Sequence, residues 1–385
     1  MKVTQIYSIL NGISSQLYGT DAISVTDLSG MIALGDAVLS SDTDKENFTD
    51  TLVDRIGKTL MGNRKYNPTD NGFLKDSFTF GAILQKIYVD VMDASETKHF
   101  TLTDGESIDP FAISKPTIKQ KLFKGVTTWE CDVTVTDVAL KSAFTSASEM
   151  ANLISSIFTA MENSIDVALE SADLANIASF IARKVEKSKA ENYSKKGVIN
   201  LLADYNTATV GTLTADEALR NKDFLKYASQ QINLWKNRMR KMSVLFNDED
   251  YKRFTDDTDM RILMLDNFSS AMSFYLESDT FNNELVKLPT YREMPYWLGS
   301  GKDYSFDSVS TVNVKLSEAV TINQKGVVGI IADVNAIGIT IKDRRTKSAY
   351  NSKGEYTNYF NKADVGYYND LSENGIVFII ADAEQ

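Results

Sequence analysis

The sequence predicts an α+β protein organised around one unusually long helix. Between Val126 and Lys196 the chain contains neither glycine nor proline. The second half of this stretch repeats apolar residues at gaps of three and four, the spacing of one face of an α-helix. These residues are Met150, Leu153, Ile154, Ile157, Phe158, Met161, Ile165, Ala168, Leu169 and Ala172. Strand patterns at residues 78–91 and 327–341 supply the β component.

The length of this helix indicates an extended molecule. Ser146 and Glu149 form an S-x-x-E capping box at its start, and the pattern continues more weakly to Val185, within a charged run at residues 184–189. About 40 helical residues at about 1.5 Å each give a rod of about 60 Å. A compact domain of about 200 residues is only about 30–35 Å across. The rod must therefore protrude or lie along something flat, which is typical of a subunit in an assembly.

Residues 1–60 mix helical and extended patterns. Ile6, Leu10, Ile13 and Leu17 have helical spacing, and residues 49–57 resemble a short helix closed by a glycine. A polar linker at residues 40–47 separates the two. We expect an arm without a core of its own, which packs on another surface such as a neighbouring subunit.

Residues 61–136 predict a long two-stranded β-hairpin. Residues 78–91 are rich in β-formers, and the return strand is expected from about Thr117 to Val135. The segment between them holds Asp-Gly, Asp-Pro and Lys-Pro turn signals, so its tip is predicted to be irregular. An isolated hairpin is marginally stable in water. A projecting one is therefore expected to be covered by a partner.

From Gly197 onwards helices and strands alternate. Thr214 and Glu217 form a capping box that predicts a helix, followed by a short strand at residues 243–246 and a helix at 248–254 capped by Asn247. The apolar face of the first helix comprises Leu225, Ala228, Ile232, Trp235, Met239 and Met242. The last strands are predicted at residues 327–331, 336–341 and 376–380.

Composition excludes several classes of protein. No apolar run reaches the ~18 residues of a membrane span, and the N-terminus does not resemble a signal peptide. One cysteine excludes an internal disulfide and fits a reducing cytoplasm. A net charge of −11 opposes general affinity for nucleic acid.

Residues suited to catalysis are scarce. His99 is the only histidine and follows a polar stretch that predicts an exposed turn. Cys131 shares the face of an alternating strand with Trp129 and Val133, so it is predicted to be a small packed hydrophobe. One histidine and one cysteine exclude a zinc or iron site rich in nitrogen or sulfur ligands. The sequence therefore predicts no catalytic, cofactor-binding or metal-binding residues, and a protein that is not an enzyme.

Three other motifs have simpler explanations. Residues 299–302, Gly-Ser-Gly-Lys, lack the first glycine and the Ser/Thr of a phosphate-binding loop and are interpreted as an ordinary loop. Residues 343–347, Asp-Arg-Arg-Thr-Lys, favour half of an ion-paired contact over a nucleic-acid contact. Asp256, Asp257 and Asp259 are not followed by the glycine and the glutamate that a calcium-binding loop requires. They are therefore predicted to lie in a solvated turn.

The predicted segments follow one another as arm, long hairpin, long helix, mixed α/β region and return strand. This order resembles that of tailed-phage major capsid proteins of the Hong Kong 97 fold. Short stretches resemble the capsid proteins of the small phi-29-type podoviruses more specifically. They are Leu-Val-Asp-Arg-Ile-Gly at residues 52–57, residues 140–144 with 154–157 before and within the long helix, and the segment from 328 to 381. Since the chain stops at Gln385 after the last predicted strand, the immunoglobulin-like domain of the phi-29 relative is expected to be absent.

The resemblance implies names for the segments of the chain. The peripheral and axial domains are the two main parts of this fold. The implied assignments are 1–60 as N-terminal arm, 61–136 as extended loop, 137–196 as spine helix of the peripheral domain, 197–345 as axial domain with adjoining peripheral strands, and 346–385 as return segment with the last peripheral strand.

The resemblance also implies a function. A structural protein of this kind self-assembles as hexamers and pentamers into the icosahedral or prolate head of a bacteriophage virion. The implied partners are copies of itself, a scaffolding protein, a portal protein and packaged double-stranded DNA without sequence-specific contacts, with no membrane. Assembly is expected in the host bacterial cytoplasm, through a procapsid. Two alternatives remain open: an encapsulin-like compartment that holds cargo enzymes, and a soluble enzyme that uses two facing carboxylates.

Overall fold

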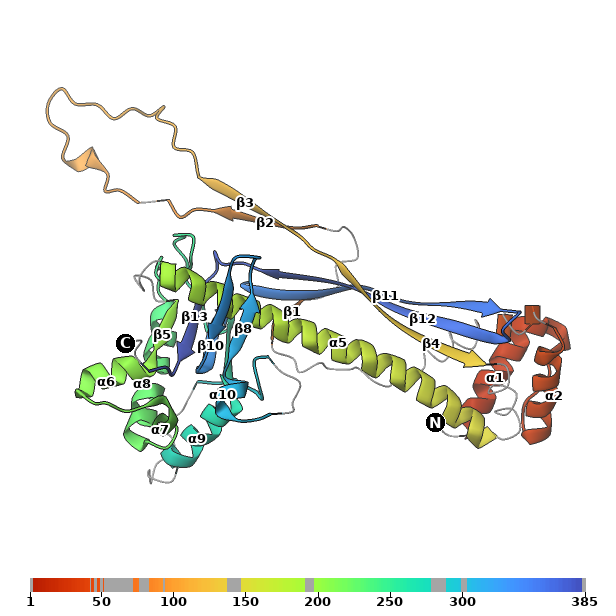
Figure 1. Ribbon diagram of the computed structural model, residues 1–385. Coiled ribbons are helices and arrows are strands. Elements are labelled where there is room, and N and C mark those ends of the chain that lie inside the picture. Colours follow the sequence, from red (N-terminus) through yellow and green to blue (C-terminus); the bar gives the residue numbers. More distant parts are fainter. Residues whose placement is uncertain are drawn as a thin grey trace.

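The computed structural model describes residues 3–41, 43–44, 47–48, 51, 72–75, 83–92, 94–136, 147–190, 197–277, 289–298 and 303–382. The molecule is elongated, with an α/β body at one end, a pair of helices at the other, and helix α5 between them (Figure 1). A thin two-stranded hairpin projects from the middle of the molecule over the body. Among the described residues, the hydrophobic core is accordingly divided into one large and three smaller clusters.

Helix α5 (Ala147–Ala190) is 44 residues long and confirms the predicted long helix. At about 1.5 Å per residue it spans about 66 Å. Met161, Ile165 and Leu169 bury its middle against one sheet, and Phe180 and Ile181 enter the large core. A single helix therefore connects the large core and two of the smaller clusters. The predicted cap at Ser146 lies outside the described residues.

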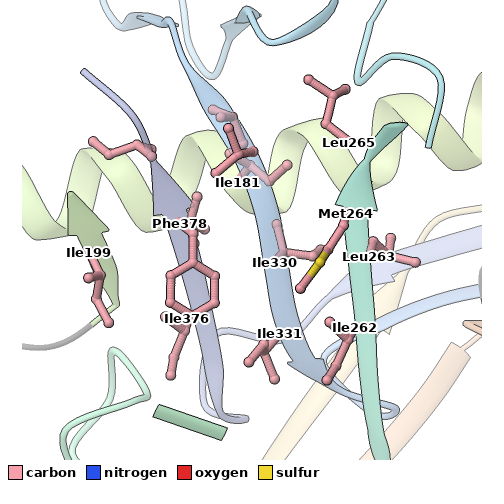
Figure 2. Close-up of a cluster of buried hydrophobic side chains, with 14 of the residues drawn as sticks. Ile181, Ile199, Ile262, Leu263, Met264, Leu265, Ile330, Ile331, Ile376 and Phe378 are labelled. Atoms are coloured by element: carbon pink, nitrogen blue, oxygen red, sulfur yellow. The ribbon is translucent and has the colours of Figure 1, made fainter. Parts of the chain in front are cut away.

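The large core surrounds a five-stranded sheet in the order β5-β13-β10-β6-β7. The strands are β5 (Val198–Asn200), β6 (Met260–Leu265), β7 (Arg292–Met294), β10 (Val327–Asp333) and β13 (Gly375–Ile379). Strand β10 pairs antiparallel with both β6 and β13, and all of its residues are buried. Figure 2 shows Ile330, Phe378 and Met264 on these adjacent strands, with α5 crossing behind them. The strands predicted at residues 327–331 and 376–380 are confirmed.

A second sheet has the order β1-β11-β12-β4 and lies along α5 (Figure 1). Its strands are β1 (Leu74–Lys75), β4 (Thr127–Thr136), β11 (Ile337–Asn351) and β12 (Tyr356–Asn369). The sequence prediction ended β11 at residue 341 and missed β12. Both strands carry many polar residues because one face of an antiparallel pair can be exposed to water.

The ion-paired interpretation of residues 343–347 is confirmed within the chain itself. Arg344 Nη2 lies 3.3 Å from Asp166 Oδ1 of α5. Arg345 Nη1 lies 2.5 Å from Asp364 Oδ2 on β12 and 3.0 Å from Asp343 Oδ2. These pairs hold the charged part of β11 to the helix and to the neighbouring strand.

The N-terminal helices form a small unit, so the expectation of an arm without a core is wrong. Helix α1 (Val3–Tyr18), the short turn η1 (Gly19–Asp21) and helix α2 (Leu28–Leu39) enclose their own apolar cluster. The described buried members of this cluster are Ile6, Leu10, Ile13, Val25, Met31, Leu34, Val38 and Phe48. Asp27 caps α2 by accepting a hydrogen bond from Gly30 N at 2.9 Å. The helix predicted at residues 49–57 lies almost entirely outside the described residues.

The predicted hairpin is only partly correct. Strand β2 (Ile83–Val89) pairs antiparallel with β3 (Ile118–Lys124), and η2 (Lys98–Phe100) lies in the loop between them. The expected return strand divides after Lys124: its second half is β4, which pairs with β12. A strand has two hydrogen-bonding edges, and sequence alone did not indicate that residues far along the chain would take one of them. The hairpin is therefore shorter, and its root is attached to the second sheet.

The remaining helices and strands complete the body. They are α6 (Leu201–Thr209), α7 (Ala215–Ala218), α8 (Lys222–Met239), α9 (Asp266–Glu277), α10 (Phe306–Val309), β8 (Val312–Lys315) and β9 (Thr321–Gln324). The helix predicted after Thr214 is in fact two, because Asn221 caps a new helix by accepting from Phe224 N at 3.0 Å. Within the described residues, no helix is long and apolar enough to cross a membrane.

The helix predicted at residues 248–254 does not form. Instead, the Asn247 side chain accepts from Tyr251 N at 3.0 Å and donates to Tyr251 O at 2.7 Å, which closes a loop. The buried Lys184 of α5 holds this loop, since its ammonium donates to Phe246 O at 3.0 Å and lies 3.3 Å from Asp248 Oδ1. The charged end predicted for the long helix thus includes a lysine that is fully buried.

Candidate functional site: the extended hairpin

The β2–β3 hairpin has an apolar face that points to solvent. In the register of the pair, Val89 lies opposite Ile118 and Gln85 opposite Leu122. The exposed side chains on this outer face include Ile87, Val89, Ile118 and Leu122, each at least half exposed. In a monomer this arrangement exposes apolar area to water, which is unfavourable by about 25 cal/mol per Å². The outer face is therefore suited to contact with another protein surface.

The opposite face of the hairpin is turned toward the body and is charged and aromatic. Its residues alternate with the exposed ones and are at least partly buried. They are Lys86, Tyr88, Lys119, Lys121 and Phe123. The usual distribution, with apolar residues inside and polar residues outside, is thus reversed in this hairpin. Polar contacts, rather than a hydrophobic core, hold its root in place.

Asp370, in the turn between β12 and β13, is the centre of these contacts. Its fully buried carboxylate lies 3.0 Å from Lys86 Nζ and 2.9 Å from Lys121 Nζ. The Tyr88 hydroxyl donates to the same carboxylate, and so does the Ser372 hydroxyl, at 2.7 Å. One carboxylate therefore binds both strands of the hairpin to the turn that leads into β13.

The surroundings stabilise the ionised form of Asp370. Burial alone would raise the pKa of this carboxyl group. The Lys86 charge, with hydrogen bonds from Tyr88, Ser372 and Lys121, outweighs burial and lowers the pKa of Asp370 well below its usual range. Burial and the hydrogen bond to Asp370 raise the pKa of Tyr88, so its phenol remains a proton donor.

A second group of charges surrounds this centre. Lys121 also pairs with Glu249, and Lys86 Nζ lies 3.8 Å from Glu373 Oε1. Arg253 Nε approaches the other oxygen of Glu373 at 3.8 Å. Burial raises the pKa of Glu373, although Arg253 and Lys86 oppose this effect. The two strands are therefore tied to the 249–253 loop as well as to the 370–373 turn.

Aromatic rings fill the space between the charged groups. The Phe123 and Tyr368 rings lie 4.9 Å apart between centroids, and Lys86 Nζ lies 5.0 Å from the Tyr368 centroid. Lys119 Nζ lies 4.0 Å from the Tyr251 ring, within the range of a cation–π contact. These contacts shield the ion pairs from water and so strengthen them.

Beyond this anchored root, the tip of the hairpin is exposed. The described residues from 94 to 117 contain only η2 as regular structure, and none of those with a described side chain is buried. Phe100, Phe111 and Ile113 are 89%, 85% and 82% exposed. His99 is in the exposed turn predicted for it, where its Nδ1 lies 3.0 Å from Thr97 Oγ1.

The other residues considered from sequence lie elsewhere and are not brought together. Cys131 is half-buried on β4 and packs with Trp129 beside a small apolar cluster, as predicted. The three aspartates at 256, 257 and 259 are exposed in a turn, where Asp257 pairs with Lys236 at 3.0 Å. Residues 299–302 lie outside the described part of the chain.

Comparison with known proteins identifies the family. The family model for the Phi29-like phage major capsid protein matches residues 6–379. The chain belongs to this family. Its members are structural capsid proteins and not enzymes, and a major capsid protein is a component of the virion. The resemblance predicted from short stretches of sequence is therefore confirmed over nearly the whole chain.

Two curated relatives are similar over part of their length. The major capsid protein of Bacillus phage PZA is 24% identical over 220 residues, which cover 55% of this chain and 44% of the relative. The major capsid protein of Bacillus phage GA-1 is 24% identical over 166 residues, which cover 43% of this chain and 34% of the relative. The match thus spans less than half of each relative.

Solved structures confirm the Hong Kong 97-type α+β fold. A chain in the capsid structure of Staphylococcus phage Andhra superposes with a TM-score of 0.55 at 11% identity, covering 83% of this chain and 85% of that one. A chain in the structure of the head fiber and inner core protein gp22 of native bacteriophage P68 gives 0.55 at 12% identity, covering 82% and 85%. At this identity the likeness concerns the fold alone.

Proposed function

We propose that this chain is the shell subunit of a tailed phage and self-assembles as hexamers and pentamers into an icosahedral or prolate head. The observation that carries the proposal is the hairpin, whose outer face exposes Ile87, Val89, Ile118 and Leu122 while its charged face is held to its own body. Covering that face with a second copy removes the apolar area from water. The family to which the chain belongs supports the same function.

The segments take the roles expected in such a shell. Residues 1–60 are the N-terminal arm, which also carries its own small core, and residues 61–136 are the extended loop that lies over a neighbour. Residues 137–196 contain the spine helix, residues 197–345 the axial domain with adjoining peripheral strands, and residues 346–385 the return segment. The 44-residue length of α5 supports this arrangement, because a long helix fits a thin, flat subunit better than a compact one.

The proposed partners of the chain are those that a phage head needs for its assembly and for the packaging of DNA. A scaffolding protein guides assembly of a procapsid in the host cytoplasm, a portal protein occupies one vertex, and double-stranded DNA is packaged inside. The net charge of −11 supports a shell that contains DNA without binding it through specific contacts.

The test is the assembly state of the chain when it is expressed with and without the candidate scaffold from its gene neighbourhood. Sedimentation velocity should show particles far larger than a 42.8 kDa subunit when the scaffold is present. A sharp monomer boundary in both preparations, at every protein concentration and salt tried, would refute the proposal.

A further inference from the structure

Several places in the chain join an asparagine or aspartate to a following glycine, the dipeptide in which side chain and main chain react most readily with each other. They are Asn11–Gly12, Asn71–Gly72, Asp104–Gly105 and Asn374–Gly375. In this reaction the main-chain nitrogen of the glycine attacks the side-chain carbonyl carbon of the preceding residue, and a five-membered ring forms. The attack needs a nitrogen outside any hydrogen bond and a side chain that can turn toward it. Asn71 lies outside the described residues, so the structure distinguishes among the other three pairs.

The first pair is held within helix α1. The Asn11 side chain donates to Val25 O at 2.8 Å and accepts from Val25 N at 2.5 Å, so its nitrogen and its oxygen are both occupied. Gly12 lies inside the helix, where each main-chain N–H donates to the carbonyl four residues earlier. Turning the Asn11 side chain onto Gly12 N would break these bonds. The folded helix therefore protects this pair.

The last pair is held beside the large core. Asn374 is fully buried, and its amide donates to the Thr255 hydroxyl at 3.2 Å. Gly375 begins strand β13, and its N–H donates to Phe246 O at 2.9 Å. The nitrogen that would attack is therefore already bound, and the side chain cannot rotate. Asparagine loses ammonia more easily than aspartate loses water, so sequence alone ranks the asparagine pairs first. The fold protects both of the described ones.

Asp104–Gly105 in the hairpin tip lacks this protection. Both residues are exposed, and a β-carbon added at Gly105 would meet no atom within 4 Å. Within the described part of the chain, neither the Asp104 carboxylate nor Gly105 N makes a hydrogen bond. The turn is closed by Glu106 N, which donates to Thr103 O at 3.0 Å and so leaves Gly105 N unused. Gly105 has a φ of +92°, so the turn favours glycine, whose nitrogen no side chain shields.

We propose that Asp104 is a site of spontaneous isoaspartate formation in the folded protein. Gly105 N bonds to Cγ of the neutral Asp104 carboxyl group, the Cγ–O bond breaks, and water leaves with the amide proton. Water then opens the ring at either carbonyl carbon and gives aspartate or isoaspartate, so no oxidant, reductant or other reactant is needed. In isoaspartate the main chain runs through Cβ and Cγ, which lengthens the turn by one carbon and redirects the tip. The inference goes beyond the proposed function, because it needs no contact between copies.

Incubation of the folded chain in heavy-oxygen water, followed by digestion in ordinary water, tests the assignment. Each ring opening adds one labelled oxygen, so the peptide that contains Asp104 should gain the label. Electron-transfer fragmentation should then show isoaspartate at this position. The peptides with Asn11 and Asn374 should stay unlabelled and keep their amides. In a urea-unfolded sample all three positions should react, since the protecting hydrogen bonds are absent.

Two variants locate the reaction within the tip. Asp104→Glu should lose the label, because the longer side chain would have to close a less favourable six-membered ring. Asp109→Glu is the matched control and should be labelled like the unmodified chain. Asp109 precedes a proline, which has no main-chain N–H, and its carboxylate accepts from Phe111 N at 2.9 Å. Isoaspartate methyltransferase with labelled S-adenosylmethionine gives a second readout of the same variants.

Three results would overturn the inference. They are the absence of label at Asp104 in the folded chain, reaction of Asn11 or Asn374 before Asp104 in that chain, and label that persists in the tip of Asp104→Glu. All of these measurements use the isolated subunit, so the inference and the proposed function can fail separately.

Discussion

Asp370 is a buried carboxylate whose ligands come from three places in the chain: Lys86 and Tyr88 on β2, Lys121 on β3, and Ser372 in its own turn. Removing one member of a buried ion pair leaves the other charged groups without compensation, which typically costs about 3–5 kcal/mol. At the residue scale, the orientation of the whole hairpin thus depends on one side chain.

We expect Asp370→Asn to release the hairpin root, because a neutral amide cannot compensate two ammonium groups. In the isolated subunit, amide hydrogen exchange of residues 83–89 and 118–124 should accelerate strongly. Asp90→Asn is the matched control, since Asp90 pairs with Lys119 at 3.2 Å and both side chains remain partly accessible to water, which limits the pair to about 1 kcal/mol or less. Equal exchange rates in both variants would show that Asp370 does not anchor the hairpin.

The raised pKa of Tyr368 predicts that the hairpin root loses stability at alkaline pH. Burial, together with the negative charges of Asp370 and Glu373, raises the pKa of Tyr368 to about 12. The neutral phenol is therefore favoured in the folded state, and its stabilising effect is complete below the unfolded pKa of about 10. This stability is lost as the pH rises toward about 12.

In urea titrations, the free energy of unfolding of the unmodified protein should consequently fall more steeply between these pH values than that of Tyr368→Phe. The phenylalanine ring keeps the packing against Phe123 but has no proton to lose. Tyr304→Phe, at a tyrosine that is 56% exposed on a separate loop, should follow the unmodified protein. Parallel curves for all three proteins would contradict the assignment.

At the scale of elements, long and continuous patterns were predictable and interrupted ones were not. Helix α5 contains no glycine or proline, and strand β10 is apolar from Val327 to Ala332 with Gly329 as its one small residue; both were predicted. Helix α2 was missed because Gly30 and Gly35 interrupt it, although Asp27 caps it and its apolar face packs on α1. Strand β12 was missed because its exposed face is polar.

The anchored root of the hairpin could not have been predicted from local sequence. Lys121 and Asp370 are 249 positions apart, and Lys86 and Asp370 are 284 positions apart. Periodicity and motif spacing report on neighbours within a few turns, so they contain no signal for such a cluster. The segment with Asp370, Ser372 and Glu373 resembles an ordinary polar turn. The exposed tip, in contrast, was indicated by its turn residues.

The tip also yields a prediction for limited proteolysis. Residues 96–114 should contain the first cleavage sites in the free subunit, because this exposed segment has almost no regular hydrogen bonding to protect it. In assembled shells the same sites should be protected by the neighbouring copy. Mass spectrometry of the early fragments identifies them, and equal cleavage rates in the two states would contradict the predicted contact.

At the scale of the whole molecule, the chain does not behave as a compact globule. In the described part of the chain its buried apolar residues are divided among four clusters, and its hairpin presents apolar residues outward. A monomer gains little from either feature, since both increase the surface that remains in contact with water. Both become favourable when neighbouring copies cover the flat subunit and its hairpin, which is the central claim of this account.

Electron microscopy tests that claim most directly. The unmodified protein and variants of the outer face of the hairpin are each expressed with the scaffold and imaged. The unmodified chain and the conservative variant Ile87→Val/Leu122→Met should form closed shells. Ile87→Asp/Leu122→Asp should remain as folded subunits, with an unchanged circular dichroism spectrum, because two carboxylates would be buried in the contact. Compact monomers from the unmodified chain, or normal shells from the aspartate variant, would contradict the account.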